Sequence, residues 1–172
     1  MAPRLGSVLS EHGLLTPAQV EEVLRQQRKT RRPFGLLAES MFNVSHEAIE
    51  EAWASQYAGR TRTIDPFEEI PRAEAVAMLD PRQAWQFRVL PMNLEGDTLV
   101  MATTQRHLCR ALRFATSVLD RPAYFVMTTD ARLAAALERF FPMPGMSAST
   151  VKGDAIRRMV TQMRLDRIRE AG

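Results

Sequence analysis

The stretch Arg4-Leu5-Gly6-Ser7-Val8-Leu9 opens a segment ending at Gln27 that recurs in degraded form 29 positions later, from Pro33-Phe34-Gly35 to Gln56. At that offset the apolar, capping and glutamine positions coincide: Val8 with Leu37, Leu15 with Val44, Thr16 with Ser45, Val20 with Ile49, Leu24 with Trp53, and Gln27 with Gln56. The chain therefore contains one helix-turn-helix unit written twice. Two such units side by side would form a pseudo-twofold surface, which suits a pseudo-twofold ligand.

Capping residues mark where the longer helix of each unit begins. Thr16 is placed as an N-cap, Pro17 occupies the first helical position, and Gln19 completes a capping box. Ser45 is the equivalent cap in the second copy. Apolar residues then recur at spacings of three and four, as on one face of a helix. With shorter helices expected at 4–10 and 34–41, residues 1–59 form a predicted subdomain of four short helices.

After Gly59 the sequence is typical of a small α+β domain. Apolar runs at 88–92 and 98–102 flank Glu95-Gly96-Asp97 and predict a β-hairpin. A third strand is expected at 123–127, and helices are expected at 73–79, 81–87, 107–117 and from Thr129 or Asp130 to about 141. Residues 60–142 therefore predict a three-stranded sheet with helices on one side, which gives an α+β fold class for the whole chain.

The remaining residues, 143–172, form a third segment. Its first part, 143–153, has the composition of a linker. Residues 155–170 predict a basic amphipathic tail helix, which could dock on the body, pair with another chain or lie on a membrane surface. Docking or pairing is favoured, because the apolar face is short and lacks an aromatic anchor.

Composition excludes several classes of protein. A chain of 172 residues with 45% apolar and 25% charged residues can bury one sizeable core or two small ones. Cys109 is the only cysteine and the three histidines are scattered, so we expect no disulfide framework and no metal. No run of 18 apolar residues and no signal peptide pattern occurs, so we expect no membrane insertion and a cytoplasmic location.

The charge balance permits a nucleotide ligand without requiring one. The net charge is +3, and nearly all the basic residues are arginines, with Lys29 and Lys152 as the only lysines. Arginine stacks on bases and grips phosphate, although a GC-rich genome would explain the same excess more simply. The charges are spread along the chain, so we expect no specific nucleic-acid binding.

Motifs of catalysis are missing from the sequence. It has no GxxxxGK[ST] phosphate loop, nucleophile elbow, GxGxxG fingerprint or CxxC pair, so we expect a non-enzyme without an ATPase domain. The carboxylates Glu21-Glu22 and Glu50-Glu51 lie off the apolar stripes, which predicts that they are solvated.

The order of these features resembles the MshE-type N-terminal (MshEN) domain of type II secretion and type IV pilus assembly ATPases. That family pattern is Arg-Leu-Gly, an apolar pair, a glycine before two apolar residues, and then Leu, Leu and Gln at helical spacing, in tandem. The first copy matches it at Arg4-Leu5-Gly6-Ser7-Val8-Leu9, Gly13-Leu14-Leu15, Val20, Leu24 and Gln27. The runs at 87–91 and 111–116 are similar to the family's second subdomain, so the resemblance covers about residues 4–142.

The resemblance implies binding of cyclic di-GMP, without a metal, across the two repeats. An arginine could pair with guanine O6 and N7 or stack on the base, and a glycine could let backbone N–H groups approach a phosphate. It further implies a partner in a secretion, pilus or polysaccharide machine, with recruitment to the inner membrane by that partner left open. The implied ligand-binding residues are Arg4, Leu5, Gly6, Leu9, Gly13, Leu24, Gln27, Arg32, Phe34, Gly35, Trp53 and Gln56.

The second copy departs from the family pattern at its most informative positions. Pro33 stands where the arginine belongs, although Arg32 is adjacent, and Phe42-Asn43 replaces the Gly-Leu of the turn. Binding could therefore be asymmetric, weak or lost. The alternative function is a protein-docking adaptor with a vestigial nucleotide site. The apolar stripes and the two repeat glycines also have a purely structural interpretation, as core and as close helix packing.

Overall fold

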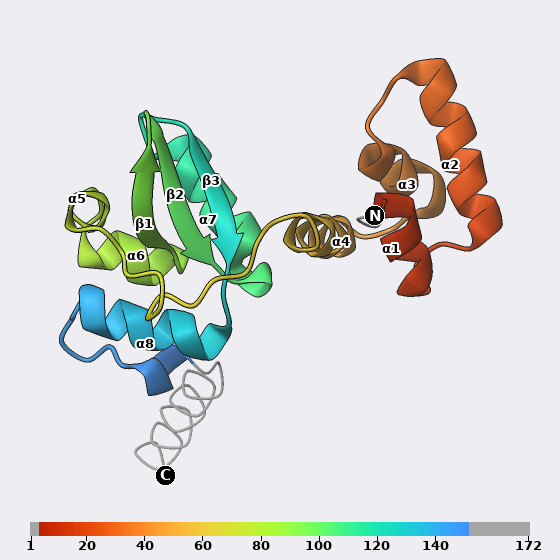
Figure 1. The fold of residues 1–172 in the computed structure, drawn as a ribbon. Coiled ribbons are helices and arrows are strands. Elements are labelled where there is room, and N and C mark those ends of the chain that lie inside the picture. Colours follow the sequence, from red (N-terminus) through yellow and green to blue (C-terminus); the bar gives the residue numbers. More distant parts are fainter. Residues whose placement is uncertain (1–3, 152–172) are drawn as a thin grey trace, which may run out of the picture.

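Four helices form the N-terminal lobe of the computed structural model, which describes residues 4–151 (Figure 1). They are α1 (Leu5–Glu11), α2 (Pro17–Thr30), α3 (Phe34–Phe42) and α4 (His46–Ala58). The predicted starts of the two longer helices are confirmed. Thr16 and Gln19 form a reciprocal capping box, in which the Thr16 N–H donates to Gln19 Oε1 at 2.8 Å. Ser45 Oγ accepts from the Ala48 N–H at 3.2 Å.

The turns of the two repeats use different residues for the same left-handed backbone. In the first repeat Gly13 has φ 69°, whereas in the second repeat Asn43 ends α3 with φ 54°. Asparagine enters this region more readily than most side chains. The left-handed position has thus moved by one residue, which explains how the second repeat turns without the glycine that Phe42 replaces.

Each short helix of the N-terminal lobe packs on the long helix of the other repeat. α1 contacts α4, and α3 contacts α2. The two repeats therefore fold side by side around one core and share its approximate twofold symmetry. The buried members of that core are Val8, Leu9, Leu15, Val23, Leu37, Ala38, Val44 and Ala52.

The second lobe contains the sheet. Its elements are α5 (Ala73–Val76), α6 (Pro81–Phe87), β1 (Leu90–Glu95), β2 (Thr98–Thr103), a 3₁₀ turn at Gln105–His107, α7 (Leu108–Ser117), β3 (Ala123–Met127), α8 (Asp130–Phe140) and a 3₁₀ turn at Ala148–Val151. The strand order is β1-β2-β3, with β1 antiparallel and β3 parallel to β2. The predicted hairpin, third strand and α+β class are confirmed.

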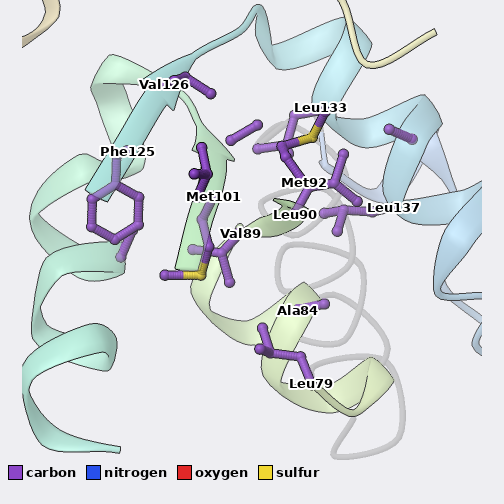
Figure 2. Close-up of a cluster of buried hydrophobic side chains, with 14 of the residues drawn as sticks. Leu79, Ala84, Val89, Leu90, Met92, Met101, Phe125, Val126, Leu133 and Leu137 are labelled. Atoms are coloured by element: carbon purple, nitrogen blue, oxygen red, sulfur yellow. The ribbon is translucent and has the colours of Figure 1, made fainter. Parts of the chain in front are cut away.

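Helices cover both faces of this sheet, whereas we expected them on one side. All four residues from Leu99 to Ala102 are completely buried, so both faces of β2 are covered. Figure 2 shows Phe125 on one side of the strands and Leu133 and Leu137 of α8 on the other. The reason is the parallel pairing of β2 with β3, which requires a crossover helix, α7, over one face. Strands covered in this way read as continuous apolar runs.

Helix α4 belongs to both lobes. Ala52 is buried in the core of the N-terminal lobe, whereas Ala54, two residues later, is buried in the core of the second lobe. α4 also contacts α7 and the 3₁₀ turn before it. The lobes are therefore joined through a helix that both of them bury.

Two further features bear on the predictions. No helix within residues 4–151 has the length and apolar character needed to cross a bilayer. The predicted tail helix at 155–170, and the end of the linker before it, lie outside the described residues.

Candidate functional site

An open pocket of about 400 Å³ lies where the two repeats meet α7. We call it the α4–α7 pocket. Its walls are mostly apolar, and one glutamate and one arginine stand among them. The lining residues are Leu5, Pro33, Gly35, Leu36, Ile49, Glu50, Trp53, Cys109, Leu112 and Arg113. Three of the twelve predicted ligand-binding residues, Leu5, Gly35 and Trp53, are brought together here.

At the junction of the two repeats, each repeat places one side chain against the other repeat. Leu5 of the first repeat lines the pocket formed mainly by the second repeat. Its counterpart, Phe34, lies against the first repeat, where its Cζ would be 3.1 Å from a β-carbon added at Gly6. Because Leu5 and Phe34 are separated by the repeat offset, this exchange is what a twofold relation between the repeats requires.

The same offset relates the second-repeat residues of the α4–α7 pocket to corresponding positions in the first repeat. Pro33, Gly35, Leu36, Ile49, Glu50 and Trp53 correspond to Arg4, Gly6, Ser7, Val20, Glu21 and Leu24 of the first repeat. The close contact of Gly35 with Ile49 is matched by that of Gly6 with Val20. The first repeat thus carries an arginine where the second has proline, and a leucine where the second has tryptophan.

The remaining predicted residues occupy three kinds of position. Leu24, Gln27 and Gln56 are half-buried, the last one turn beyond Trp53 on α4. Arg4 and Arg32 are exposed, and neither forms an ion pair with any residue in 4–151. Leu9 is fully buried beneath the repeats and Gly13 is an exposed turn residue, so these two are not brought to the pocket.

An ion pair stands at the pocket between the two lobes. Arg113 Nη2 donates to Glu50 Oε1, and this hydrogen bond raises the pKa of the Arg113 guanidinium. His46 Nε2 lies 3.5 Å from the same carboxylate oxygen. The Glu50 side chain is 30% exposed, so the expectation that it is simply solvated is wrong. Its partner lies 63 residues away in the sequence, beyond the reach of helical spacing.

Sequence reasoning missed every pocket residue that α7 supplies. Cys109, Leu112 and Arg113 sit on consecutive turns of one face of that helix. Their pattern marks an amphipathic helix, but nothing in it indicates which other element the helix meets. Ile49 and Pro33 were visible in the repeat alignment, as a core position and as a departure from the family pattern.

A second cavity, of about 770 Å³, shares Glu50 and Cys109 with the α4–α7 pocket. Four carboxylate residues line it, Glu47, Glu50, Glu51 and Asp130, together with Thr128 and others. None of the twelve predicted residues is among them. Carboxylates repel phosphate, and they outnumber the one arginine of this lining, Arg106, so the cavity suits a dinucleotide less well than the α4–α7 pocket does.

No metal site accompanies either cavity in the part of the chain that the structure describes. Across residues 4–151, no group of three or more His, Cys, Asp and Glu side chains is placed to hold an ion.

Comparison with known proteins connects the second lobe to a family. The family model described as the MshEN domain matches residues 59–147, which are more than half of the chain. That match begins where α4 ends, so the tandem repeats precede it. The chain matches no curated protein.

Among solved structures, the chain is similar to MshE with cdg at 26% identity and a TM-score of 0.47, over 81% of this chain and 99% of that one. It is also similar to the N-terminal domain of XpsE in two crystal forms. The first has 14% identity and a TM-score of 0.44, over 80% of this chain and 94% of that one. The second has 16% identity and a TM-score of 0.37, over 82% and 100%.

Proposed function

Because the chain belongs to the MshEN domain family, we propose that it is a non-catalytic module that binds cyclic di-GMP across its two N-terminal repeats. The observation that carries the proposal is the exchange of Leu5 and Phe34 between the repeats. Each repeat thereby contributes to the half-site of the other. Cyclic di-GMP carries two guanines and two phosphates in a ring with twofold symmetry, so it matches a surface built from two equivalent halves.

The chemistry of the surface suits this ligand. Apolar side chains, with Trp53 and Phe34 among them, offer faces on which a base can stack. Arg4 and Arg32 have no carboxylate partner within the described residues, so each can grip a phosphate or a guanine without first breaking an ion pair. Gln27 and Gln56 end the two helices at equivalent, half-buried positions, where an amide can still reach a ligand.

Calorimetry with the full chain tests the proposal. Titration with cyclic di-GMP should release or absorb heat that fits one ligand per chain. Arg4→Ala and Gln27→Ala should each weaken binding by about 1–3 kcal/mol, the usual cost of losing a charge-assisted or buried hydrogen bond. Gln26→Ala is the matched control, because it removes the neighbouring glutamine, which lies off the repeat alignment. Absence of any binding at micromolar protein, in low and in moderate salt, would end the proposal.

We further propose that the chain passes ligand binding on to a protein of a secretion, pilus or polysaccharide machine. Family membership supports a partner of this kind, and α4 offers a route, because it lines the pocket and is buried in both lobes.

The departures of the second repeat favour a second candidate, a docking adaptor whose nucleotide site is vestigial. Pro33 removes the arginine of that half-site, and Phe42 removes the glycine of its turn. A pull-down of the partner protein on the immobilised chain, with and without cyclic di-GMP, distinguishes the relay from the adaptor. A relay predicts capture that changes with cyclic di-GMP, whereas an adaptor predicts capture that ignores it.

A further inference from the structure

The second half-site lacks an arginine of its own, and a guanidinium from the other lobe stands at its edge. Pro33 occupies the position that Arg4 holds in the first repeat, and it lines the α4–α7 pocket. Arg113 of α7 lines the same pocket, with 66% of its side chain exposed. Arg113 is thus anchored on the second lobe, and its guanidinium is already held at the half-site of the second repeat by its ion pair with Glu50.

We infer that the α4–α7 pocket takes one guanine of cyclic di-GMP, with Arg113 donating to guanine O6 and N7 while Glu50 accepts from the N1–H and the N2 amino group. This inference rests on the proposed function and assigns two specificity-determining residues to it.

Because Arg113 is paired with Glu50, we expect the group bound here to be a base and not a phosphate. A lone arginine would favour either group, but Arg113 carries Glu50 beside it, so the local charge is near zero. A phosphate would meet the Glu50 carboxylate and be repelled. A guanine presents two acceptors on one edge and donors on the next, which is the pattern that a neighbouring donor and acceptor can read together.

The walls of the pocket fit a flat, largely apolar ring. Trp53 supplies an aromatic face, and Leu5, Leu36, Ile49 and Leu112 supply aliphatic contacts. Leu36 is 49% exposed, which makes it one of four large apolar side chains open to solvent among the described residues. A base seated here would cover it. The ring faces are therefore held by apolar contact, and the ring edges by the ion pair.

Comparison with adenine distinguishes specific hydrogen bonding to guanine from non-specific attraction of any base. Its amino group at position 6 would meet Arg113, donor against donor, and its N1 acceptor would meet the Glu50 carboxylate. The wild-type chain should therefore prefer cyclic di-GMP to cyclic di-AMP. Glu50→Gln should narrow that preference, because an amide can both accept and donate. A residue that served only to hold the lobes together would not change base selectivity.

The test compares dissociation constants for the two dinucleotides in the full-length chain. Arg113→Ala should weaken cyclic di-GMP binding by about 5- to 150-fold, the range for losing a bidentate guanine contact. Arg110→Ala is the matched control, because Arg110 is exposed one turn earlier on α7 and donates instead to the Gln86 carbonyl. The affinity of Arg110→Ala for cyclic di-GMP should stay within about twofold of wild type, since Arg110 does not line the pocket.

The outcomes separate this inference from the proposed function. If the wild-type chain binds cyclic di-GMP and Arg113→Ala binds it equally well, the inference is wrong and the function stands. Loss confined to Arg32→Ala would assign the missing arginine to the second repeat itself and overturn the role of Arg113. If the wild-type chain binds no cyclic di-GMP, both fail together. Melting temperatures of all variants show whether any loss reflects unfolding.

Discussion

The Tyr57 hydroxyl forms hydrogen bonds with both backbone polar groups of Phe125, the N–H and the C=O. The Tyr57 hydroxyl accepts from the Phe125 N–H at 3.1 Å and donates to the Phe125 C=O at 3.2 Å. Thr61 Oγ1 donates to the same carbonyl at 2.9 Å. A tyrosine at the end of α4 thus occupies hydrogen-bonding positions at the edge of β3 and ties the repeat lobe to the sheet.

Removing that hydroxyl should destabilise the chain measurably. In Tyr57→Phe the carbonyl keeps Thr61, but the N–H loses its partner, so we expect a loss of about 1–3 kcal/mol in the free energy of unfolding. Urea denaturation measures it. Tyr124→Phe is the control, since the Tyr124 hydroxyl donates to the exposed Glu95 carboxylate and not to the backbone. Equal losses in the two variants would contradict the special role of Tyr57.

Gly6 and Gly35 have too little space around them for a β-carbon. A β-carbon at Gly6 would lie 2.8 Å from Val20 Cγ1, and one at Gly35 would lie 2.7 Å from Ile49 Cγ2. Both neighbours are β-branched and fixed in a helix. Overpacking should exceed the roughly 0.5–1 kcal/mol that alanine gains over glycine in a helix. We expect each Gly→Ala variant to lose about 1–2 kcal/mol of stability in chemical denaturation.

Compensating changes test the cause of that loss. Val20→Ala should restore stability to Gly6→Ala in part, and Ile49→Ala should do so for Gly35→Ala, because each removes the methyl group that obstructs the new one. Strictly additive losses in the two double variants would show that the glycines serve another purpose. Close helix packing, one of the two interpretations open from the sequence, would then be wrong.

The sequence predicts local structure here far better than it predicts contacts between lobes. Thr16, Gln19 and Ser45 cap helices through residues at most three positions away, and the strand at 123–127 has the predicted bounds. The repeat offset even places Leu5 and Phe34 as a pair. Nothing local indicates that Arg113 meets Glu50 or that α8 covers the second face of the sheet. Those contacts depend on how the two lobes and the crossover helix pack.

Acid should destabilise the fold through His107. Burial lowers the pKa of His107 to about 4, from an ordinary 6.5. Between these values the unfolded chain binds a proton that the folded chain does not, so stability falls as the pH falls through this window. The loss should reach about 2 kcal/mol at pH 5 relative to pH 7. Denaturation at both pH values measures it, and an equally steep pH dependence in His107→Gln would exclude His107 as its source.

Cys109 provides a native reporter of the α4–α7 pocket and of the second cavity, because it lines both. Burial raises the pKa of its thiol, so little thiolate is present at neutral pH, and alkylation by iodoacetamide should be slow. Since Cys109 lines the pocket, saturating cyclic di-GMP should slow alkylation several-fold further. Mass spectrometry of quenched samples follows the reaction. A rate unchanged by bound ligand would show that the ligand leaves the Cys109 thiol accessible to the reagent.

The position of α4 also decides how the chain can be divided. A cut after Gly59 follows the change in composition, yet it would strip Ala54 of the surface that buries it and leave the Phe125 backbone without Tyr57. Each fragment would present to water an apolar face that the other now hides. Heating should therefore give a single calorimetric transition, and the two halves should accumulate poorly when expressed apart.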